Sequence, residues 1–411
     1  MTVTTLLAFE LSGSAALAGL AASASAFGAG VAAAAIGATS RFGRRPGLVG
    51  GYLVGLLGAA LAVIAAVVTS FPLMVAATFL FGSSNASNLQ SRYAATDLSS
   101  AARRGSDLSI VVWATTVGAV LGPNLTGPGV VAAGILGVPD LAGPYLLSAS
   151  AFAASALLLL VGLRPDPLRM ARDLAAAERA SDGAVPVAPR RRSVVTTLRV
   201  VVAQPSTRAA IATIASAQAV MVGVMVMTPV HMGHHGADVR IIGLTISLHI
   251  FGMYAFSPIF GRLVDRIGTR AVLGVGLAQL LLAVLLAALS TPQGGVGFLA
   301  GLLLLGTGWS AALIASSALL TESLPIEDRA PAQGLSDLAM NVAGGSAGAL
   351  SGLLMTLLGY PLMAAATIAL LLGPAWLIIV AVSQQRDRRG SGHGATGTVM
   401  VSRTTGDAEG A

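Results

Sequence analysis

Long apolar runs separated by short polar turns limit this chain to one kind of fold. A helix of about 20 apolar residues crosses a bilayer, because each residue adds ~1.5 Å across a hydrocarbon core ~30 Å thick. The runs that reach this length are 15–38, 47–70, 73–96, 106–128, 143–162, 209–231, 239–260, 271–290, 296–320, 332–358 and 362–383. Backbone groups inside lipid must find partners within their own segment, so each run is predicted to be a helix. The sequence therefore predicts an all-α polytopic membrane protein with eleven full spans.

Composition and charge agree with a membrane protein. Hydrophobic residues make up 55% of the 411 residues and charged residues 10%, against about 25% charged in soluble chains. The net charge of +7 does not indicate a nucleic-acid partner, because all basic residues except Arg92 and Arg240 lie in or beside alternate loops. Positive loops mark the cytoplasmic side, so we expect a multi-pass protein of the cytoplasmic (plasma) membrane with a cytoplasmic C-terminus.

Two copies of one Arg-rich segment indicate an internal duplication. The segment Gly261–Arg270 lies between two apolar runs, and an altered copy, 36–45, lies between two others. At a single offset of 225 residues the matched pairs are Arg41 with Arg266, Gly43 with Gly268, Asp97 with Glu322, and Arg104 with Arg329. A duplicated bundle of membrane helices is typical of a transporter with two halves, here expected to be related by a pseudo-twofold axis along the membrane normal.

The duplication divides the chain into four parts. They are an N-terminal helix half, 1–162, a cytoplasmic central loop, 163–208, a C-terminal six-helix half, 209–383, and a disordered cytoplasmic tail, 384–411. Within the central loop, a surface helix is expected near 168–180.

The first half begins with a stub, 1–11, that would cover only about 16 Å as a helix. Because the second half has six spans, we expect the stub to be an incomplete first helix, left by a misassigned start codon or a truncated gene. A chain extended upstream by about ten to fifteen residues is then expected to transport where this one does not. A genuine eleven-span protein and a non-transporting remnant are the alternatives.

The segment Gly261–Arg270 resembles the cytoplasmic loop signature of the major facilitator superfamily, Gly-x-Leu-x-Asp-Arg-x-Gly-Arg-Arg. Thr269 stands where an Arg is usual, and the first copy has Ile36 for the leading Gly and Ser40 for the Asp. The resemblance implies a major-facilitator-type bundle of two halves, which transports by alternating access.

The same residues favour a reversible latch on the cytoplasmic side. A carboxylate near a helix N-terminus is stabilised by ~0.3–1 kcal/mol, so we expect Asp265 to dock on the start of the span 106–128. Arg44 is expected to pair with Asp97, and an exposed pair of this kind stabilises a protein by about 0–1 kcal/mol. The full latch set is Arg41, Gly43, Arg44, Asp97, Gly261, Asp265, Arg266, Gly268, Arg270 and Glu322, with Arg266 or Arg270 pairing with Glu322. In the alternative interpretation these arginines only fix the topology.

A glycine-rich stretch in the span 106–128 bears on the direction of transport. Gly118, Gly122, Pro123 and Gly127 resemble the Gly-Pro signature in the fifth helix of the superfamily's antiporters, with Thr126 in place of a Gly. Gly-Pro within a helix removes a hydrogen bond and bends the span, while glycine permits close contact with a neighbouring helix. The resemblance implies export by antiport, and an ordinary packing kink is the alternative.

Polar and adaptable side chains within the spans are candidates for contact with cargo or protons. Arg92 shares a helical face with Asn85 and Asn88. Arg92 is expected either to face a cavity and meet an anionic group or a proton site, or to extend outward to the membrane surface. His249 lies deep in a span and is either a proton carrier or a packing donor. The other candidates, which line a cavity or fill the core, are Gln218, Met221, Met225, Trp309 and Asn341.

These features predict a secondary active transporter, with proton-coupled efflux of small apolar compounds as the expected activity. An importer or metabolite facilitator is the alternative within transport. A polytopic membrane enzyme would need clustered catalytic groups, so no enzymatic activity is expected. The expected partners are a small-molecule substrate, the proton gradient and the lipid bilayer, with the protein acting as a monomer. No cofactor or metal is expected, and His231, His234 and His235 are assigned to a solvated loop.

Overall fold

A computed structural model describes residues 2–181, 194–290 and 295–380, and every regular element in these ranges is helical. The α-helices are α1 (Thr2–Ser12), α2 (Ala15–Thr39), α3 (Arg45–Val67), α4 (Phe71–Thr96), α5 (Arg104–Asn124), α6 (Thr126–Leu136), α7 (Gly143–Gly162), α8 (Pro167–Ser181), α9 (Val194–Ala203), α10 (Pro205–His234), α11 (Val239–Tyr254), α12 (Ser257–Ile267), α13 (Thr269–Leu289), α14 (Val296–Ser323) and α15 (Ile326–Ala366). A further helical stretch covers 369–380, and two short 3₁₀ turns cover Ser40–Phe42 and Asp140–Ala142. The tail expected at 384–411 lies outside the described residues.

Within these ranges, nine helical segments are long and apolar enough to cross a membrane. One of them, 326–380, holds two helices, because Gly359 has a φ of 74° and a ψ of 164° and interrupts the first. α4 is too polar to be counted by hydropathy, yet it packs against α2 and α3 inside the bundle. With α4 and the second helix of 326–380, the segments correspond to the predicted spans, and the all-α membrane fold is confirmed.

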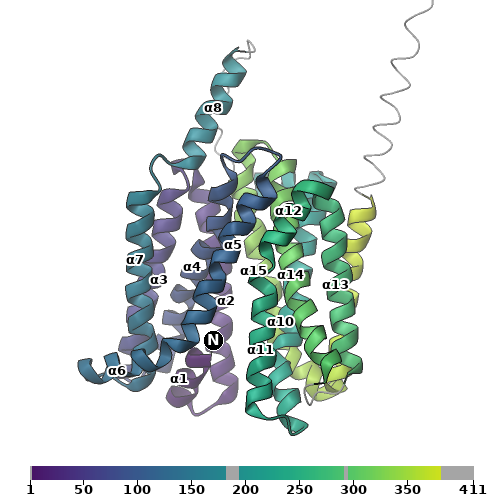
Figure 1. Ribbon diagram of the computed structural model, residues 1–411. Coiled ribbons are helices and arrows are strands. Elements are labelled where there is room, and N and C mark those ends of the chain that lie inside the picture. The colour runs from purple at the N-terminus through teal and green to yellow at the C-terminus, as the bar shows by residue number, and fades with distance from the viewer. Residues whose placement is uncertain (1, 182–193, 291–294, 381–411) are drawn as a thin grey trace, which may run out of the picture.

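The helices form two groups that lie side by side (Figure 1). α2, α3, α4 and α7 pack on one another in the first group, and α10, α11, α13, α14 and α15 do so in the second. The groups meet where α2 packs on α15 and where α5 packs on α12. α8 projects from one end of the bundle (Figure 1), the end at which the arginine-bearing turns gather. We call this the arginine-rich end.

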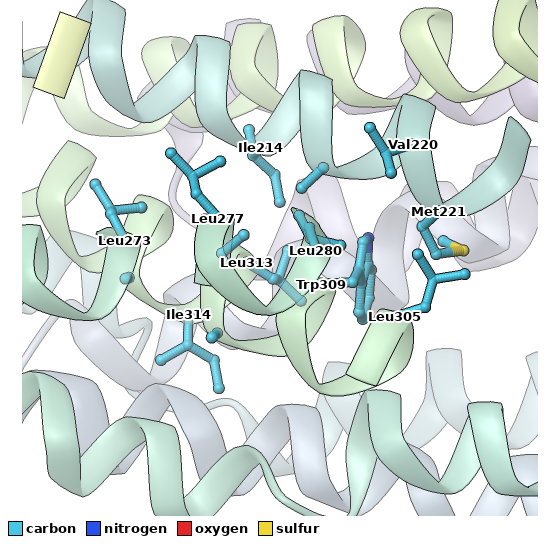
Figure 2. Packing of buried hydrophobic residues seen from close by; sticks show 14 of the residues in the cluster. Ile214, Val220, Met221, Leu273, Leu277, Leu280, Leu305, Trp309, Leu313 and Ile314 are labelled. Atoms are coloured by element: carbon cyan, nitrogen blue, oxygen red, sulfur yellow. The ribbon is translucent and has the colours of Figure 1, made fainter. Parts of the chain in front are cut away.

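The largest apolar core lies in the second group. Figure 2 shows Ile214 and Val220 of α10, Leu277 and Leu280 of α13, and Trp309 of α14 within it. Leu108 and Val112 of α5 join the same core, and α5 packs more on the second group than on the first.

The predicted span 106–128 is wrong at its outer end. α5 stops at Asn124, and α6 starts at Thr126 and runs across the end of the first group (Figure 1). Between them, the Leu125 amide donates to the carbonyl oxygens of both Leu121 and Gly122, each at 3.1 Å. The chain therefore changes from one helix to the next at Leu125, just after the Gly-Pro pair.

The close helix contact expected at Gly118, Gly122 and Gly127 is also wrong. A Cβ built at any of them meets no atom within 4 Å in the described part of the chain. These glycines face open space rather than a neighbouring helix, so in this structure they affect the backbone of α5 and not its packing.

The Arg-rich segment of the second half differs from the expected turn. α11 ends at Tyr254, and a separate helix, α12, carries the motif as far as Ile267. The turn itself is confined to Gly268, whose φ of 88° lies in the left-handed region that favours glycine. Seven positions of the motif, 261–267, therefore lie on one rigid helix, which fixes the direction of Asp265.

The N-terminal stub is a helix that packs into the first group. Leu7 and Ala8 of α1 are buried, and the Thr4 and Tyr145 hydroxyls are hydrogen-bonded at 2.8 Å. α1 contacts α2 and α4 (Figure 1), so this short helix is part of the wall of the first group.

Candidate functional site

A buried ion pair joins the beginning of α3 to the end of α4. Arg44 Nε donates to Asp97 Oδ2 at 2.7 Å and Arg44 Nη2 donates to Asp97 Oδ1 at 2.9 Å. The two side chains are 1% and 2% exposed, so this bidentate pair is shielded from water, unlike the exposed pair that was expected. Arg44 Nη2 also donates to Gln333 Oε1 of α15 at 2.6 Å, which extends the contact to the second group.

The equivalent contact in the second half is weaker. An offset of 225 residues carries Arg44 to Thr269 and Asp97 to Glu322. Thr269 Oγ1 donates to Glu322 Oε2 at 3.3 Å, so the two matched positions meet in both halves. Arg266 is exposed, and Arg270 donates to Ser206 Oγ at 3.1 Å. In the second half a threonine stands where the first half has Arg44, and the pairing of Glu322 with Arg266 or Arg270 stays a prediction.

Asp265 lies against the N-terminus of α5, where it was expected. Its Oδ1 accepts from the Gly105 amide at 2.8 Å, and its Oδ2 accepts from the Ser106 amide at 2.9 Å. The Ser106 hydroxyl adds a third bond at 2.5 Å. Amides of a helix's first turn have no partner within the helix, so one carboxylate supplies two of them and complements the helix dipole.

Gly261 makes this docking possible. A Cβ at Gly261 would lie 2.6 Å from Gly105 O and 2.5 Å from Ser109 Cβ, so α12 and α5 touch through backbone here. In the other contact between the groups, a Cβ at Gly37 of α2 would lie 3.0 Å from Gly334 Cα of α15. Both contacts between the groups therefore depend on glycine at the arginine-rich end.

Asp166, just before α8, binds the first copy of the motif. Its carboxylate accepts from the Arg44 amide at 3.0 Å and the Arg45 amide at 2.8 Å, and it also caps α8 at the Leu168 amide at 3.1 Å. Gly43, with a φ of 100°, lies directly under this carboxylate and has no room for a Cβ. Arg41 is exposed, with its guanidinium 4.5 Å from the Phe42 ring centroid.

Replacing Asp166 with alanine is expected to destabilise the arginine-rich end. The amides of two helix starts lose their acceptor together, which costs about 1–2 kcal/mol for a capping residue. Thermal unfolding of the detergent-solubilised protein measures the loss as a lower Tm. Asp173→Ala, on the exposed face of α8, is the matched control and is expected to leave Tm unchanged. Equal Tm values for the two variants would contradict the capping role.

A second buried ion pair crosses between the groups. Arg92 Nη2 of α4 donates to Asp337 Oδ1 of α15 at 2.6 Å, and both side chains are at most 2% exposed. Arg92 Nε donates to Ser317 Oγ of α14 at 3.1 Å, Arg92 Nη2 donates to Tyr93 OH at 3.0 Å, and Arg92 Nη1 donates to Leu89 O. Arg92 thus meets an anionic group in the interior, and the alternative in which it extends to the membrane surface is wrong.

A cavity of about 10 Å³, roughly the space that one water needs, adjoins this pair. It is lined by Asn88 and Arg92 of α4, by residues of α5 and α14, and by Tyr254 of α11. Asn85, the third member of the expected stripe, is exposed and does not line it. The helical spacing correctly predicted that Asn88 and Arg92 line the same cavity. Asn85, one helical turn from Asn88, lies outside it.

The second-half candidates do not form one site. Gln218 Oε1 accepts from Trp309 Nε1 at 2.6 Å, and Trp309 packs edge-on against Tyr254 at 5.9 Å. The remaining candidates are placed as follows: Met221 is buried in the core, Met225 is partly buried beside it, Asn341 Nδ2 donates to Asp337 O at 2.8 Å, and His249 Nδ1 contacts Leu302 O at 3.0 Å. His249 therefore lies between α11 and α14, as a packing contact would.

His231 does not belong to a solvated loop. Its ring stacks on Tyr360 with centroids 4.1 Å apart, and the side chain is 7% exposed. α10 continues as a helix to His234, beyond the predicted end of the span, and this extension buries His231.

Sequence reasoning did not connect Arg44 and Arg92 to the partners that complete these networks, although Asp337 was already a candidate proton-carrying carboxylate. Gln333 and Asp337 are four residues apart on α15, as are Ser317 and Thr321 on α14. Residues at this spacing share a helix face, so polar pairs within otherwise apolar spans were the available signal.

Comparison with known proteins agrees with this architecture. The sequence model of the Major Facilitator Superfamily matches residues 1–238 and again 210–404. The chain belongs to the Major Facilitator Superfamily. It is 40% identical over 377 residues to "Uncharacterized MFS-type transporter YddS" of Bacillus subtilis, covering 91% of this chain and 85% of that protein. It is 28% identical over 301 residues to "Riboflavin transporter RfnT" of Brucella anthropi, covering 73% and 70%.

Solved structures of Major Facilitator Superfamily proteins share the fold. The structure of the E. coli fucose:proton symporter FucP aligns with a TM-score of 0.67 at 15% identity, covering 92% of this chain and 93% of that one. Since the superfamily consists of membrane transporters, the chain is a multi-pass membrane transporter, and the contacts between α2 and α15 and between α5 and α12 join its two halves.

Proposed function

We propose that this transporter exports small, largely apolar compounds by alternating access, driven by the proton gradient, with the arginine-rich end facing the cytoplasm. One observation carries the proposal. The halves are joined at the arginine-rich end by polar contacts and glycine-backbone contacts, such as Asp265 on α5 and Arg92 with Asp337. Contacts of this kind can separate and re-form as units.

The side chains nearest the meeting point of the halves support apolar cargo. Trp309 and Tyr254 present aromatic surface, with Gln218 and Asn88 as the adjacent hydrogen-bonding groups. Mostly apolar walls with a few polar groups are typical of small-molecule sites. The glycine-rich end of α5 resembles the antiporter signature and supports export.

Import of a metabolite is the second candidate. It is favoured by the likeness to the Brucella anthropi protein named a riboflavin transporter. Riboflavin has a planar ring system, which suits an aromatic wall with hydrogen-bonding neighbours.

Vesicle transport with two probes decides between these activities. Everted membrane vesicles that express the protein are energised to an acid interior and given ethidium or riboflavin. Export predicts ethidium accumulation that collapses when the proton gradient is dissipated. Riboflavin uptake only by right-side-out vesicles or cells would favour import, and no gradient-dependent movement of either probe would contradict the proposed efflux.

A further inference from the structure

The two buried arginines at the interface differ in where their counter-ions lie. Arg44 is paired with Asp97, and both belong to the first half. Arg92 also belongs to the first half, but its carboxylate partner, Asp337, belongs to the second. When the halves separate at this end, the Arg44 pair moves as a unit, while the Arg92 pair must break.

Breaking this pair leaves two buried charges without compensation. Arg92 retains Leu89 O and Tyr93 OH on its own helix, so it keeps two acceptors after separation. Asp337 loses its bond from Arg92, and Asn341 binds the Asp337 backbone carbonyl rather than its carboxylate. An ionised carboxylate without a partner in a region of low dielectric is strongly disfavoured, and proton binding removes that charge.

The geometry of Asp337 leaves a place for that proton. Its Oδ1 accepts from Arg92, while its Oδ2 is buried and has no hydrogen-bond partner among the described residues. A proton on Oδ2 converts the carboxylate to a neutral acid and removes most of its attraction to Arg92.

The surroundings of Asp337 contain few other ionisable groups. Arg92 and Tyr93 of α4 face it, and Arg44 at the start of α3 is the next nearest charge. α2 carries no titratable side chain, and α14 presents Ser317 and Thr321. The other titratable residues of α15 and of the helices packed on it lie toward helix ends or on the surface helices; they are Arg169, Arg172, Asp173, Glu178, Arg179, Arg199, Arg208, His231, His234, Arg270, Glu322, Glu327, Asp328, Arg329 and Tyr360.

We propose that Asp337 is the proton-binding residue of the transport cycle. Ionised, it pairs with Arg92 and holds the arginine-rich end closed; with a proton on Oδ2, it releases Arg92 and the end opens. The proton leaves to the aqueous phase when the pair re-forms. This inference rests on the proposed proton coupling and names its site.

The chain has no cysteine, so the opening can be measured directly in the natural background. Ser100→Cys in the turn between α4 and α5 and Ile267→Cys at the end of α12 are exposed positions on opposite halves for spin labels. Pulsed electron paramagnetic resonance in lipid nanodiscs then gives the fractions of closed and open molecules between about pH 5.5 and about pH 8.5. This measurement needs no substrate.

We expect the open fraction of the labelled parent to rise as the pH falls. Asp337→Asn mimics the neutral acid, so it should be open to the same extent at every pH, with an open-to-closed ratio at least about fivefold above the parent at high pH. Asp107→Asn, which lies at the same end and is paired with Arg103 in its own half, is the matched control and should keep the pH response.

A pH response that survives in Asp337→Asn would overturn the proposal, as would a parent whose open fraction ignores pH. If Asp337→Asn does not fold, the double variant Arg92→Met with Asp337→Leu removes both charges and should show the same loss of pH response. Ethidium transport is scored separately. A pH-dependent opening without ethidium transport would contradict the proposed efflux and support the role of Asp337. Proton-driven ethidium transport with a pH-insensitive opening would support the efflux and contradict the role of Asp337.

Discussion

Asp265→Asn is expected to slow substrate transport about tenfold while leaving membrane insertion intact. The carboxylate binds the Gly105 and Ser106 amides of α5 with both oxygens, and asparagine replaces one of those oxygens with an NH₂ group that faces a donor. A charge in this position at a helix N-terminus contributes up to about 2 kcal/mol, and 1.4 kcal/mol changes an equilibrium tenfold. The closed state is therefore depopulated, and the cycle loses one of its two end states.

The matched control for this prediction is Asp238→Asn. Asp238 caps α11 through the Arg240 amide at 2.8 Å, at the opposite end of the bundle and within the second half. The Asp238→Asn variant loses the same charge at a helix N-terminus and leaves the contact between the halves unchanged. Initial transport rates in vesicles, normalised to the amount of protein in the membrane, compare the two variants. Unchanged transport kinetics in Asp265→Asn would contradict the role of Asp265 in the cytoplasmic latch.

The largest loss of stability is expected for Arg44→Met. Removing Arg44 leaves Asp97 buried and ionised without its partner, and removing one member of a buried pair costs about 3–5 kcal/mol. The same change deprives Gln333 Oε1 of its donor, so the contact to α15 weakens as well. Thermal unfolding of the purified protein, together with its yield from membranes, measures the effect.

The double variant Arg44→Met with Asp97→Leu separates charge from packing. If the loss comes from the unpaired carboxylate, removing both charges should recover most of the stability, because a buried pair replaced by apolar side chains is often neutral. A double variant as unstable as Arg44→Met would assign the loss to packing and to Gln333 instead.

Local patterns in the sequence predicted those features that depend on a single helix or motif. The apolar runs gave the spans because lipid leaves the backbone no alternative to helix. The motif position of Asp265 gave its contact with α5, because a carboxylate is stabilised at the N-terminus of a helix.

Contacts between the two halves could not be predicted from local sequence patterns. Arg92 had two possible environments, and the choice depended on Asp337, which lies 245 residues away on a helix that the local pattern does not connect to it. Likewise, Gly-Pro in α5 indicated a bend, but whether the helix kinks or ends at Leu125 depends on what packs around it.

The contact between Arg92 and Ser317 joins two residues 225 positions apart, the offset that separates the two copies of the chain. Residues that correspond under a twofold axis and also touch must lie close to that axis. In an ancestor made of two identical subunits, this position would have met its own copy. Two buried arginines there would repel, whereas two serines would hydrogen-bond. The contact at this position is therefore one that two different residues can make and two arginines cannot, so the transporter needs its two halves to differ here.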